Sequence, residues 1–478
     1  MDQEDPSGVM VYIAVPQTLQ DEIKDLVSMA TETPTFRNGE DFAADEREVY
    51  RRADRIGDKV VARRLQTVAD MDEIRDAGRR LAKPEGQRQR VKDQGHRDVH
   101  IMTMRGGEIT IRTSYFSRNC DLRRSRGSYP VLGLLGIYGC RRYYTPGLAN
   151  HVVLLTTAMG SIDEAKGWLS ELGISLCVET IQTMTYQYAQ RVRASQKASS
   201  MKFDETLAGR RVVVSVDGGR IRVRRKKRGR KSKKGRTCYH AEWREPKLLM
   251  IYVIDASGRI DRAWNQVIDG LLKPHGEAAD AIFRLMKYYL EELEIAKADT
   301  ILFVADGARW IWARVQQLVN ELGLRREQVL ELVDFYHAVE HLRTVAELRR
   351  GWSTKQRKQW ITKQRHGLRN GKTDEVIASI DQLCQGRLSK KFRTERDYFR
   401  RNDHRMRYRA IVRKHLPIGS GAIESAIRRV VNLRLKGAGI FWYEESANAM
   451  LVLRSYYKAG RMQQLATLAL NQPLALAA

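Results

Sequence analysis

The apolar residues of the chain change their spacing near residue 208. Before this point they recur every three or four positions, notably over Ala44–Leu81 and Leu148–Arg193, and this period predicts amphipathic helices. Beyond it, short runs rich in valine, isoleucine and leucine take over, as expected of strands that are buried on both faces. The sequence therefore predicts a mostly helical first part and an α/β second part.

The second part alternates strand-like and helix-like segments. The predicted segments, in chain order, are strands at Arg211–Gly219, Arg220–Val223 and Lys247–Ala256, a helix at Glu277–Leu293, a strand at Thr300–Asp306, a helix at Trp310–Leu322 and a strand at Val329–Phe335. Three strands followed by alternating helices and strands predict a mixed α/β sheet.

A charged segment with helical spacing follows the last predicted strand. Residues 343–415 contain no strand signal, so we expect a helical insertion there. The sequence LPIGSG at Leu416–Gly421 ends it, and Ser420 is expected to cap a helix that runs to Leu435. A further helix is predicted at Tyr443–Lys458, and the chain after Met462 is expected to form a peripheral tail.

The first part contains a charged helical region and a small hairpin. Residues 1–95 favour a solvated helical hairpin, although an arm that binds DNA ends or a second subunit fits the same pattern. Lys83–His100 is polar and predicts a linker. Arg105–Phe116 alternates polar and apolar β-formers, which predicts a β-hairpin.

Two helices on either side of Gly173 have the pattern of a helix-turn-helix. Ser161 is expected to cap the first, at Ile162–Leu172, and Val178–Arg193 forms the second. Residues of the second helix that would face a DNA groove are Thr180, Gln182, Thr183, Tyr186 and Gln187, with Arg191 and Arg193 near phosphate. An ordinary corner between two helices has the same pattern.

The composition favours a partner with negative charge. Lysine and arginine number 85 against 57 acidic residues, and the resulting net charge of +28 is typical of proteins that bind nucleic acid. Five scattered cysteines without CxxC spacing argue against a disulfide framework or zinc finger and favour a reducing, cytoplasmic compartment. The first residues lack the pattern of a signal peptide, and no apolar run is long enough to span a membrane.

Two of the predicted buried strands end in Asp-Gly. These strands carry Asp217 and Asp306, and two carboxylates at one rim of a sheet repel each other unless a cation lies between them. Glu424, in the first turn after Gly-Ser-Gly, is the expected third ligand. Because Mg²⁺ and Mn²⁺ prefer oxygen ligands, three such carboxylates predict a pair of metal ions that acts on phosphodiester bonds.

A strongly basic segment comes directly after Asp217. Arg220–Val223 can continue as a second strand, whereas Arg224–Arg236 is too basic to enter a core and predicts a loop. The position beside Asp217 predicts contacts with the phosphates of the DNA being processed. The residues expected to make these contacts are Arg220, Arg222, Arg224, Arg225, Lys226, Lys227, Arg228 and Arg230.

With these motifs, residues 211–458 resemble the catalytic domain of bacterial insertion-sequence transposases of the DDE type, most nearly the Kra-type group, which is akin to Mutator-like transposases. The matching motifs are SVDGGRIRVR, LFVADGARWIW and LPIGSGAIESAIRRVVNLRLKG, in this order. Asp334-Phe-Tyr-His337 is similar to the DxxH signature of the family. The resemblance implies an RNase H-like fold with a helical insertion, in which Asp217, Asp306 and Glu424 are catalytic and Asp334 and His337 accessory.

The resemblance also implies the reaction and its partners. A transposase of this kind cleaves double-stranded DNA at the terminal repeats of its element and joins a 3′-hydroxyl to target DNA, using two Mg²⁺ or Mn²⁺ ions. Pairing of two DNA ends implies at least a homodimer. The expected parts are a charged helical region at 1–95, a hairpin and helix-turn-helix at 96–200, the catalytic domain at 208–342 and 416–460, the insertion at 343–415 and the tail at 461–478.

Two other interpretations remain open. His337, Glu340 and His341 fit HxxEH, the zinc signature of inverted-motif metallopeptidases, although a peptidase explains neither the charge nor the repeated Asp-Gly. An RNase H-like DNA-binding protein without catalytic activity also fits the sequence. His337 could form a hydrogen bond within the core instead of lying near the scissile phosphate.

Overall fold

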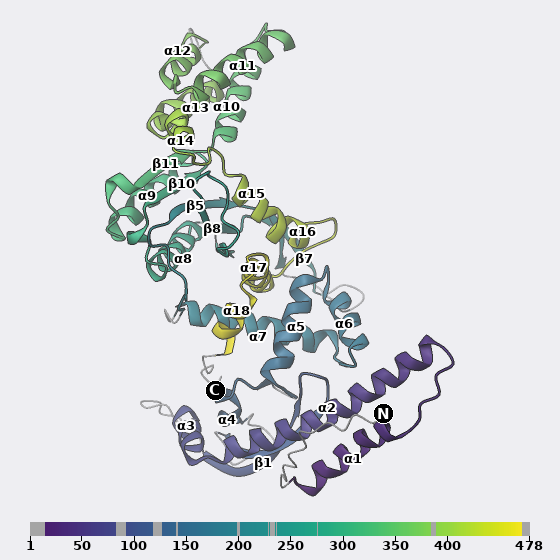
Figure 1. The fold of residues 1–478 in the computed structure, drawn as a ribbon. Coiled ribbons are helices and arrows are strands. Elements are labelled where there is room, and N and C mark those ends of the chain that lie inside the picture. Colours follow the sequence, from purple (N-terminus) through teal and green to yellow (C-terminus); the bar gives the residue numbers. More distant parts are fainter. Residues whose placement is uncertain are drawn as a thin grey trace, which may run out of the picture. The chain divides into compact units, whose positions relative to one another are not determined.

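The computed structural model describes residues 15–82, 92–117, 127–139, 142–197, 201–227, 229, 235, 237–274, 276–383 and 389–470. The chain divides into two compact units, an N-terminal unit of residues 1–191 with 470–478 and a C-terminal unit of residues 192–469. Figure 1 draws both units as a ribbon and labels their helices and strands where there is room.

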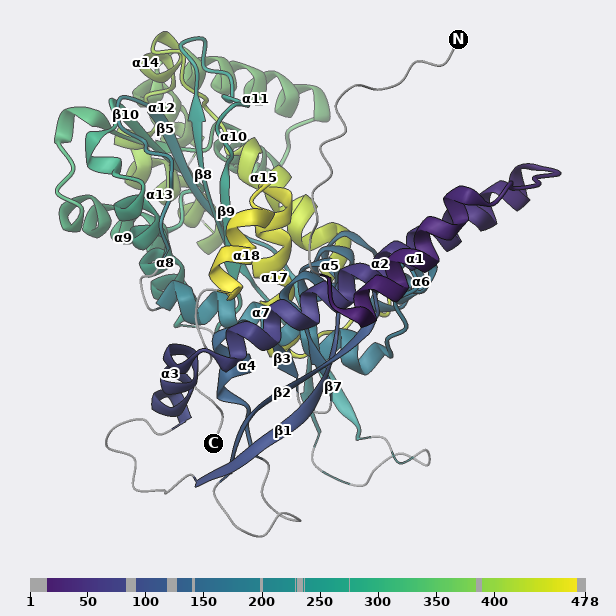
Figure 2. The same ribbon diagram turned by 60° about the horizontal axis from the view of Figure 1, so that its bottom comes forward.

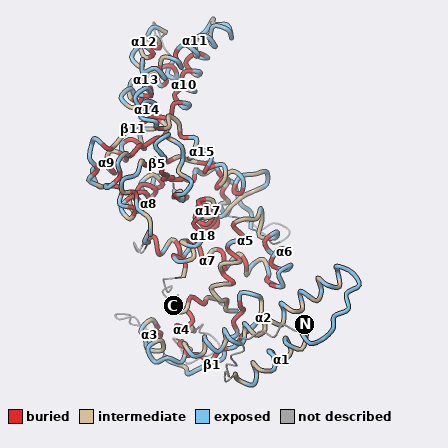
Figure 3. Tube along the Cα trace, in the orientation of Figure 1, coloured by how far each residue is buried: buried red, intermediate tan, exposed pale blue. Residues whose placement is uncertain are grey.

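The N-terminal unit begins with the helical hairpin that the sequence predicts. α1 (Gln17–Thr31) packs along α2 (Gly39–Asp70), and α3 (Asp72–Ala82) follows. Ion pairs with N–O distances of 2.6 to 3.2 Å connect the basic residues of α2 with the acidic residues of α1. Most of the hairpin surface is exposed (Figure 3), so these pairs contribute little stability each.

A small sheet follows the hairpin and corrects two predictions. The segment predicted as a β-hairpin, Arg105–Phe116, forms a turn and one strand, and its partner strand lies earlier in the chain, in the predicted linker. β1 (Lys92–Met102) and β2 (Glu108–Ser117) are antiparallel, and two short strands, β4 (Tyr143–Tyr144) and β3 (Tyr138–Gly139), complete the order β2-β1-β4-β3. The predicted linker at Lys83–His100 is therefore wrong from residue 92 onward, while residues 83–91 lie outside the described residues. The first half of β1 is solvent-exposed and polar, so it lacks the apolar positions from which a strand could have been predicted.

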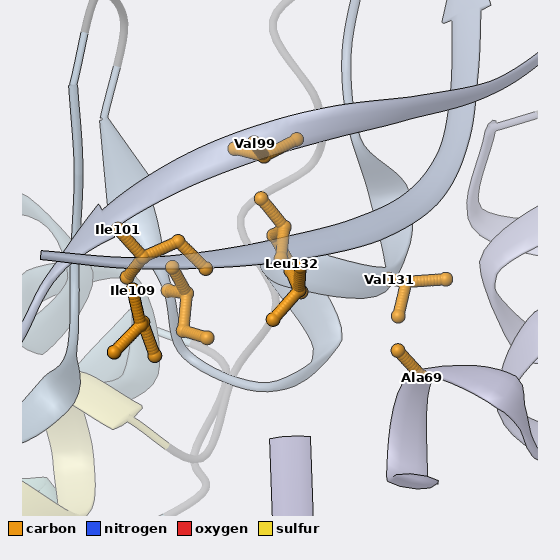
Figure 4. Packing of buried hydrophobic residues seen from close by; sticks show 8 residues of the cluster. Ala69, Val99, Ile101, Ile109, Val131 and Leu132 are labelled. Carbon is orange, nitrogen blue, oxygen red and sulfur yellow. The ribbon is translucent and has the colours of Figure 1, made fainter. Parts of the chain in front are cut away.

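The apolar half of this sheet builds the core of the N-terminal unit. Val99 and Ile101 of β1 pack with Ile109 of β2 and Leu132 of α4 (Pro130–Leu134), as Figure 4 shows. Three helices follow, α5 (Pro146–Ala158), α6 (Ile162–Glu171) and α7 (Val178–Lys197). The predicted pair of helices and the cap at Ser161, whose hydroxyl accepts a bond from the Glu164 amide at 3.0 Å, are confirmed.

The C-terminal unit contains a mixed five-stranded sheet in the order β11-β10-β5-β8-β9. The strands are β5 (Arg211–Gly218), β8 (Lys247–Ile254), β9 (Val267–Leu271), β10 (Thr300–Ala305) and β11 (Val329–Val333). β9, β8 and β5 are antiparallel neighbours, whereas β5, β10 and β11 run parallel. The mixed α/β prediction is confirmed, although β9 was not expected.

A separate two-stranded ribbon follows β5. β6 (Ile221–Lys226) pairs with β7 (Tyr239–Arg244) and not with the main sheet. The predicted second strand is thus present, but the predicted loop is wrong for Arg224–Lys226, which continue β6. Buried Ile221 and Val223 alternate with Arg222 and Arg224, which are partly exposed, and Arg225 and Lys226 at the end of the strand are exposed, so their charge does not prevent a strand.

Helices cover the two sides of the main sheet (Figures 1 and 2). On one side lie α8 (Ala278–Glu292) and α9 (Arg309–Glu321), whose apolar side chains meet those of β5 and β10. On the other lie α15 (Gly421–Ile427), a π-helical turn at Arg428–Asn432, α16 (Leu433–Leu435) and α17 (Glu444–Lys458). α17 is almost wholly buried (Figure 3).

The described residues of the predicted insertion form helices joined by short turns, and they contain no strand. The insertion comprises the end of α10 (Phe335–Leu348), α11 (Thr354–Arg369), α12 (Thr373–Leu383), α13 (Lys390–Asn402), a 3₁₀ turn at Asp403–Arg405 and α14 (Tyr408–Arg413). These helices pack on one another at the β11 side of the sheet (Figure 1).

The C-terminal segment differs from its prediction as a peripheral tail. α18 (Met462–Leu470) buries Leu465 and Leu468, and the Ser195 hydroxyl donates to the Leu468 carbonyl at 2.6 Å. Residues 462–469 are thus part of the C-terminal unit's packing, because their leucines cover apolar surface, while residues 471–478 lie outside the described residues. Among the described residues, no helix is both long and apolar enough to cross a membrane.

Candidate active site

Three aspartates stand at the same level of the main sheet. β10 pairs in parallel with β5, with Phe303 opposite Val214, and with β11, with Ala305 opposite Val333. Continued by a few residues, this register sets Asp306 level with Asp217 on one side and with Asp334 on the other. Strands that end in register deliver their side chains to one rim of a sheet, so the two predicted Asp-Gly units meet there.

Asp217 lies at the end of β5 in a half-buried position. Burial raises the pKa of its carboxyl group to about 6, and the negative charge of Asp306 adds to this, while the Gly218 amide, His337 and Lys247 oppose it. The amide of Gly218 donates to Asp217 Oδ1 at 2.6 Å. The two carboxylates are therefore close enough to repel each other, as expected of a pair that shares a cation.

Asp306 directly follows β10. Its Oδ1 accepts a hydrogen bond from the Ala308 amide at 3.0 Å, and its carbonyl accepts one from Trp312 Nε1 at 2.8 Å. The Trp312 bond fixes the main chain of Asp306 against α9. The carboxylate is held by one neighbouring amide, so it keeps capacity for a further partner.

Asp269 of β9 shows how a structural Asp-Gly differs. Its carboxylate is fully buried and accepts bonds from Arg193 at 3.0 Å, Gln196 at 2.8 Å, Tyr289 at 2.8 Å and the amide of the next residue at 2.7 Å. Within the described parts of the chain, Asp217 and Asp306 each receive one hydrogen bond, from a backbone amide close by in the chain. The two predicted catalytic aspartates are therefore under-satisfied, unlike the structural one.

Gly307 allows the insertion to close over Asp306. A Cβ atom at this position would lie 2.2 Å from Cε2 of Tyr398 and 2.8 Å from Nδ2 of Asn402, both on α13. The pKa of Tyr398 is raised by burial and by the charges of Asp306 and Asp334, so this ring lies beside both carboxylates. No sequence signal marks Tyr398, because it is remote in the chain and its helix is charged.

Gly307→Ala is expected to destabilise the C-terminal unit by about 1–3 kcal/mol, because the new methyl group overlaps a buried ring. Urea unfolding followed by tryptophan fluorescence measures this, since all eight tryptophans except Trp168 belong to that unit. Gly421→Ala is the matched control, because no atom lies within 4 Å of its Cβ position. Equal stability of the two variants would contradict the close packing of α13 on Gly307.

Asp334 is buried and fully engaged. Its Oδ1 accepts from the His337 amide at 2.8 Å, which caps α10, and its Oδ2 accepts from both the amide and the hydroxyl of Ser420. Ser420 Oγ also lies 3.2 Å from Oε1 of Glu424. Ser420 occupies the predicted N-cap position of α15, but its side chain makes no bond to the helix backbone, because its hydroxyl points to Asp334 and Glu424. That part of the prediction is wrong.

Glu424 lies exposed in the first turn of α15, which packs against β5. Gly219, just beyond β5, approaches this helical segment, since a Cβ there would lie 3.5 Å from Ile427 and 3.1 Å from Val431. Within the described part of the chain, no three His, Cys, Asp or Glu side chains are grouped closely enough to hold a metal ion. The aspartate pair thus suits a cation, while Glu424 stands nearby without joining it.

The HxxEH residues lie on α10, as helical spacing predicts. The His337 ring is half exposed and 3.8 Å from Glu340, and its charge acts on Asp217, so His337 faces the aspartate pair. His341 Nδ1 lies 2.5 Å from Oε2 of Glu395, and its ring stacks on Tyr398 with centres 3.6 Å apart. His341 is engaged with the insertion, and no described side chain completes a zinc site.

Lys247 is a neighbour of the site that the sequence did not single out. It begins β8 opposite Gly218, and its charge acts on Asp217. Its ammonium group lies 2.7 Å from Oε1 of Glu245 and 4.3 Å from the ring centre of Trp310. The sequence feature that could have indicated Lys247 is its position as a lysine at the start of an otherwise apolar strand.

The basic residues predicted to contact DNA fall into three groups. Those that lie over aromatic rings are Arg220, Arg222 and Arg224. Those at the exposed end of the ribbon are Arg225, Lys226 and Lys227. Those outside the described residues are Arg228 and Arg230. The ribbon thus presents cationic side chains close in the chain to Asp217.

Aromatic side chains hold the first group in place. The guanidinium groups of Arg220 and Arg222 lie 5.3 and 5.7 Å from the ring centre of Trp243, and that of Arg224 lies 4.8 Å from the ring centre of Tyr239. Trp243 and Tyr239 are 52% and 44% exposed, so the ribbon has an open surface of arginines and aromatic rings. Such a surface suits phosphates and unpaired bases.

The predicted groove-facing residues lie on the first half of α7. Thr180, Gln182 and Gln187 are half-buried and Thr183 is exposed. The two arginines expected near phosphate are placed differently. Arg191 is buried, with its guanidinium 3.7 Å from the ring centre of Tyr138, and Arg193 pairs with Asp269. Both serve packing, because each cation finds its partner inside the protein.

The raised pKa of Asp217 predicts a pH dependence of stability in metal-free protein. The folded state binds this proton more tightly than the unfolded state, so stability is lost as the pH rises from about 4 through about 6. Asp217→Asn removes the charge and should stabilise the protein at pH 8 by about 1–3 kcal/mol, less than the full shift because the group is half exposed to solvent. Urea unfolding of both proteins in EDTA at pH 4.5 and pH 8 measures the difference. If the stability gained through Asp217→Asn were larger at pH 4.5 than at pH 8, the raised pKa of Asp217 would be contradicted.

No family model matches this chain, and no curated protein is similar to it in sequence. Among solved structures, a Drosophila P element transposase strand transfer complex is similar at 10% sequence identity, over 67% of this chain and 80% of that chain, with a TM-score of 0.22. This similarity is too low to assign a fold or a function.

Proposed function

We propose that this protein is a DNA transposase of the DDE type. The observation that carries the proposal is the placement of Asp217 and Asp306, in register on adjacent parallel strands, with an elevated pKa at Asp217 and a single backbone donor for each carboxylate. Buried carboxylates that repel each other without a partner suit divalent cations.

We also propose that the main sheet is RNase H-like. Its support is the strand order β9-β8-β5-β10-β11, in which the first three strands are antiparallel and the last two run parallel to β5. The helical insertion enters after β11 and returns before Glu424, which agrees with the order of motifs in the family that the sequence resembles.

Asp217 and Asp306 would hold the ions, with Glu424 as the third proposed ligand. Two Mg²⁺ or Mn²⁺ ions bound there would activate a water or a 3′-hydroxyl and stabilise the leaving oxygen. Asp334 acts as a positioning residue, because through Ser420 it fixes the start of the helix that carries Glu424. His337 faces the site from α10 and is an accessory residue near the scissile phosphate.

Double-stranded DNA is the proposed substrate and target. The ribbon of β6 and β7 would contact phosphates, and α7 would enter a groove of the terminal repeat. The net charge of +28 supports both contacts. The reaction needs two DNA ends at once, so we propose that the active form is a homodimer or larger.

Cleavage of the DNA that flanks the gene tests this function. Purified protein is incubated with end-labelled duplexes that span each flank, with Mg²⁺, with Mn²⁺ or with EDTA. The expected result is metal-dependent nicking at a fixed position in each flank, with release of a 3′-hydroxyl. Specific binding without cleavage under all conditions would support the inactive DNA-binding protein, and one tight zinc ion per chain would support the peptidase.

A further inference from the structure

An open cleft lies between α9 and the end of the insertion. It is lined by Arg309, Trp312, Ala313 and Gln316 of α9, and by Arg401, Asn402 and Arg405 from α13 and the following turn. Its volume of about 320 Å³ is large enough for a phosphate group with its neighbouring sugar atoms. The cleft belongs wholly to the C-terminal unit.

Three guanidinium groups converge on this cleft. The pKa of Arg401 is lowered by burial and by the charges of Arg309 and Arg405, so the three cations repel one another. Arg405 is neutralised by Glu331 at 2.6 Å. Among the described residues, neither Arg309 nor Arg401 forms an ion pair; Asp397, the carboxylate whose charge reaches Arg401, pairs with Arg396. The cleft therefore carries about two uncompensated positive charges.

A buried donor in this cleft lacks a partner. Arg401 Nη2 donates to the carbonyl of Gly307 at 3.4 Å, whereas Arg401 Nε is buried and has no hydrogen-bond partner among the described residues. A buried donor that is left unpaired destabilises a protein, and a phosphate oxygen that reached the Arg401 guanidinium would satisfy it. Arginine suits phosphate in particular, because its fork of donors matches two phosphate oxygens.

The position of the cleft points to a DNA strand. Gly307, which Arg401 contacts, directly follows Asp306 of the aspartate pair. Trp312 offers no stacking face for a free nucleotide, because it is 4% exposed and the Arg405 guanidinium lies 4.6 Å from its ring centre. The site thus recognises phosphate and not a base.

We propose that Arg309 and Arg401 bind a backbone phosphate of the DNA, close to the phosphodiester bond that is cleaved at the aspartate pair. This inference rests on the proposed function for the identity of the ligand. The insertion would then contribute directly to the DNA path, since Arg401 comes from α13 and Arg309 from the helix that follows Asp306.

Salt-dependent DNA binding tests this proposal without cleavage. Wild type, Arg309→Gln and Arg401→Gln are titrated with a duplex of the element end in Ca²⁺, at several NaCl concentrations. Each variant is expected to bind about tenfold more weakly, and the slope of log K against log[salt] is expected to fall by about 0.9 for each lost phosphate contact. Arg365→Gln, an exposed arginine of α11 outside the cleft, is the matched control and should retain the wild-type slope.

Other outcomes of these titrations would count against the proposal. Wild-type slopes in both cleft variants, or an equal loss in Arg365→Gln, would show that no phosphate is bound there. Calorimetry with ATP and with inorganic phosphate identifies the source: tight ATP binding that is lost in Arg309→Gln, with DNA binding unchanged, would replace DNA by a nucleotide. Because Arg309 is exposed, its variant folds even where Arg401→Gln fails to. If the cleft variants show the reduced salt slope but the wild type does not cleave DNA, the proposed function is refuted and the phosphate site remains supported.

Discussion

Asp306→Asn is expected to reduce metal-dependent cleavage of element-end DNA by a factor on the order of 10³ or more, while the protein stays folded and binds DNA. The carboxylate is half-buried at the end of β10 and level with Asp217, and it keeps capacity for a partner beyond the Ala308 amide. A metal ligand stabilises transition-state charge by several kcal/mol, and asparagine removes the negative charge that holds the ion.

Asp299→Asn provides the matched control for this experiment. Asp299 is exposed just before the opposite end of β10, so the same chemical change is made away from the site. Single-turnover cleavage rates of wild type and both variants, with saturating protein and Mg²⁺, measure the effect. If Asp306→Asn cleaved at the wild-type rate, Asp306 would have no place in the catalytic site.

Asp334→Ala is expected to lower the free energy of unfolding of the C-terminal unit by about 3–5 kcal/mol. The substitution removes the acceptor of the His337 and Ser420 amides, and it leaves the Ser420 hydroxyl with Glu424 Oε1 at 3.2 Å as its remaining acceptor. Each unsatisfied buried donor destabilises by about 1–3 kcal/mol. The start of α15 loses its anchor as well, so cleavage should fall by roughly a hundredfold even under conditions where the protein is folded.

The structural and catalytic effects of Asp334 can be separated. Urea unfolding by tryptophan fluorescence gives the stability, and Asp374→Ala, in the exposed first turn of α12, should change it by less than about 0.5 kcal/mol. Asp334→Asn keeps an acceptor for the His337 amide but places an amide group against Ser420, so an intermediate loss is expected. Unchanged stability of Asp334→Ala together with lost cleavage would instead indicate that Asp334 binds the metal directly.

The sequence predicted the strands that deliver the aspartates because their burial is continuous. β5 and β10 are uninterrupted apolar runs, and such runs are recognisable without any knowledge of their neighbours. β9 was missed because Asp269 interrupts a short run, and its charge is compensated only by Arg193, Gln196 and Tyr289 from distant segments. β1 and β7 were missed because their polar residues are stabilised by pairing with a neighbouring strand.

The candidate site was predictable to the extent that it depends on strand ends. Asp217 and Asp306 meet because parallel strands in register bring their last residues together. The packing of Tyr398 on Gly307 and the link from Asp334 through Ser420 to Glu424 were not predictable, since they join segments that are far apart in the chain. The arginine cleft was not predictable for the same reason, because α13 and α9 are far apart in the chain and meet only in the folded protein.

Titration with Mn²⁺ in the presence of uncleaved element-end DNA measures directly whether Asp217 and Asp306 together hold the catalytic cation. Electron paramagnetic resonance of free Mn²⁺ gives the number of ions bound per chain. Wild type and Asp299→Asn are expected to bind two ions, and Asp217→Asn and Asp306→Asn are each expected to lose at least one. Equal Mn²⁺ binding by wild type, Asp217→Asn and Asp306→Asn would show that these two aspartates do not hold the cation.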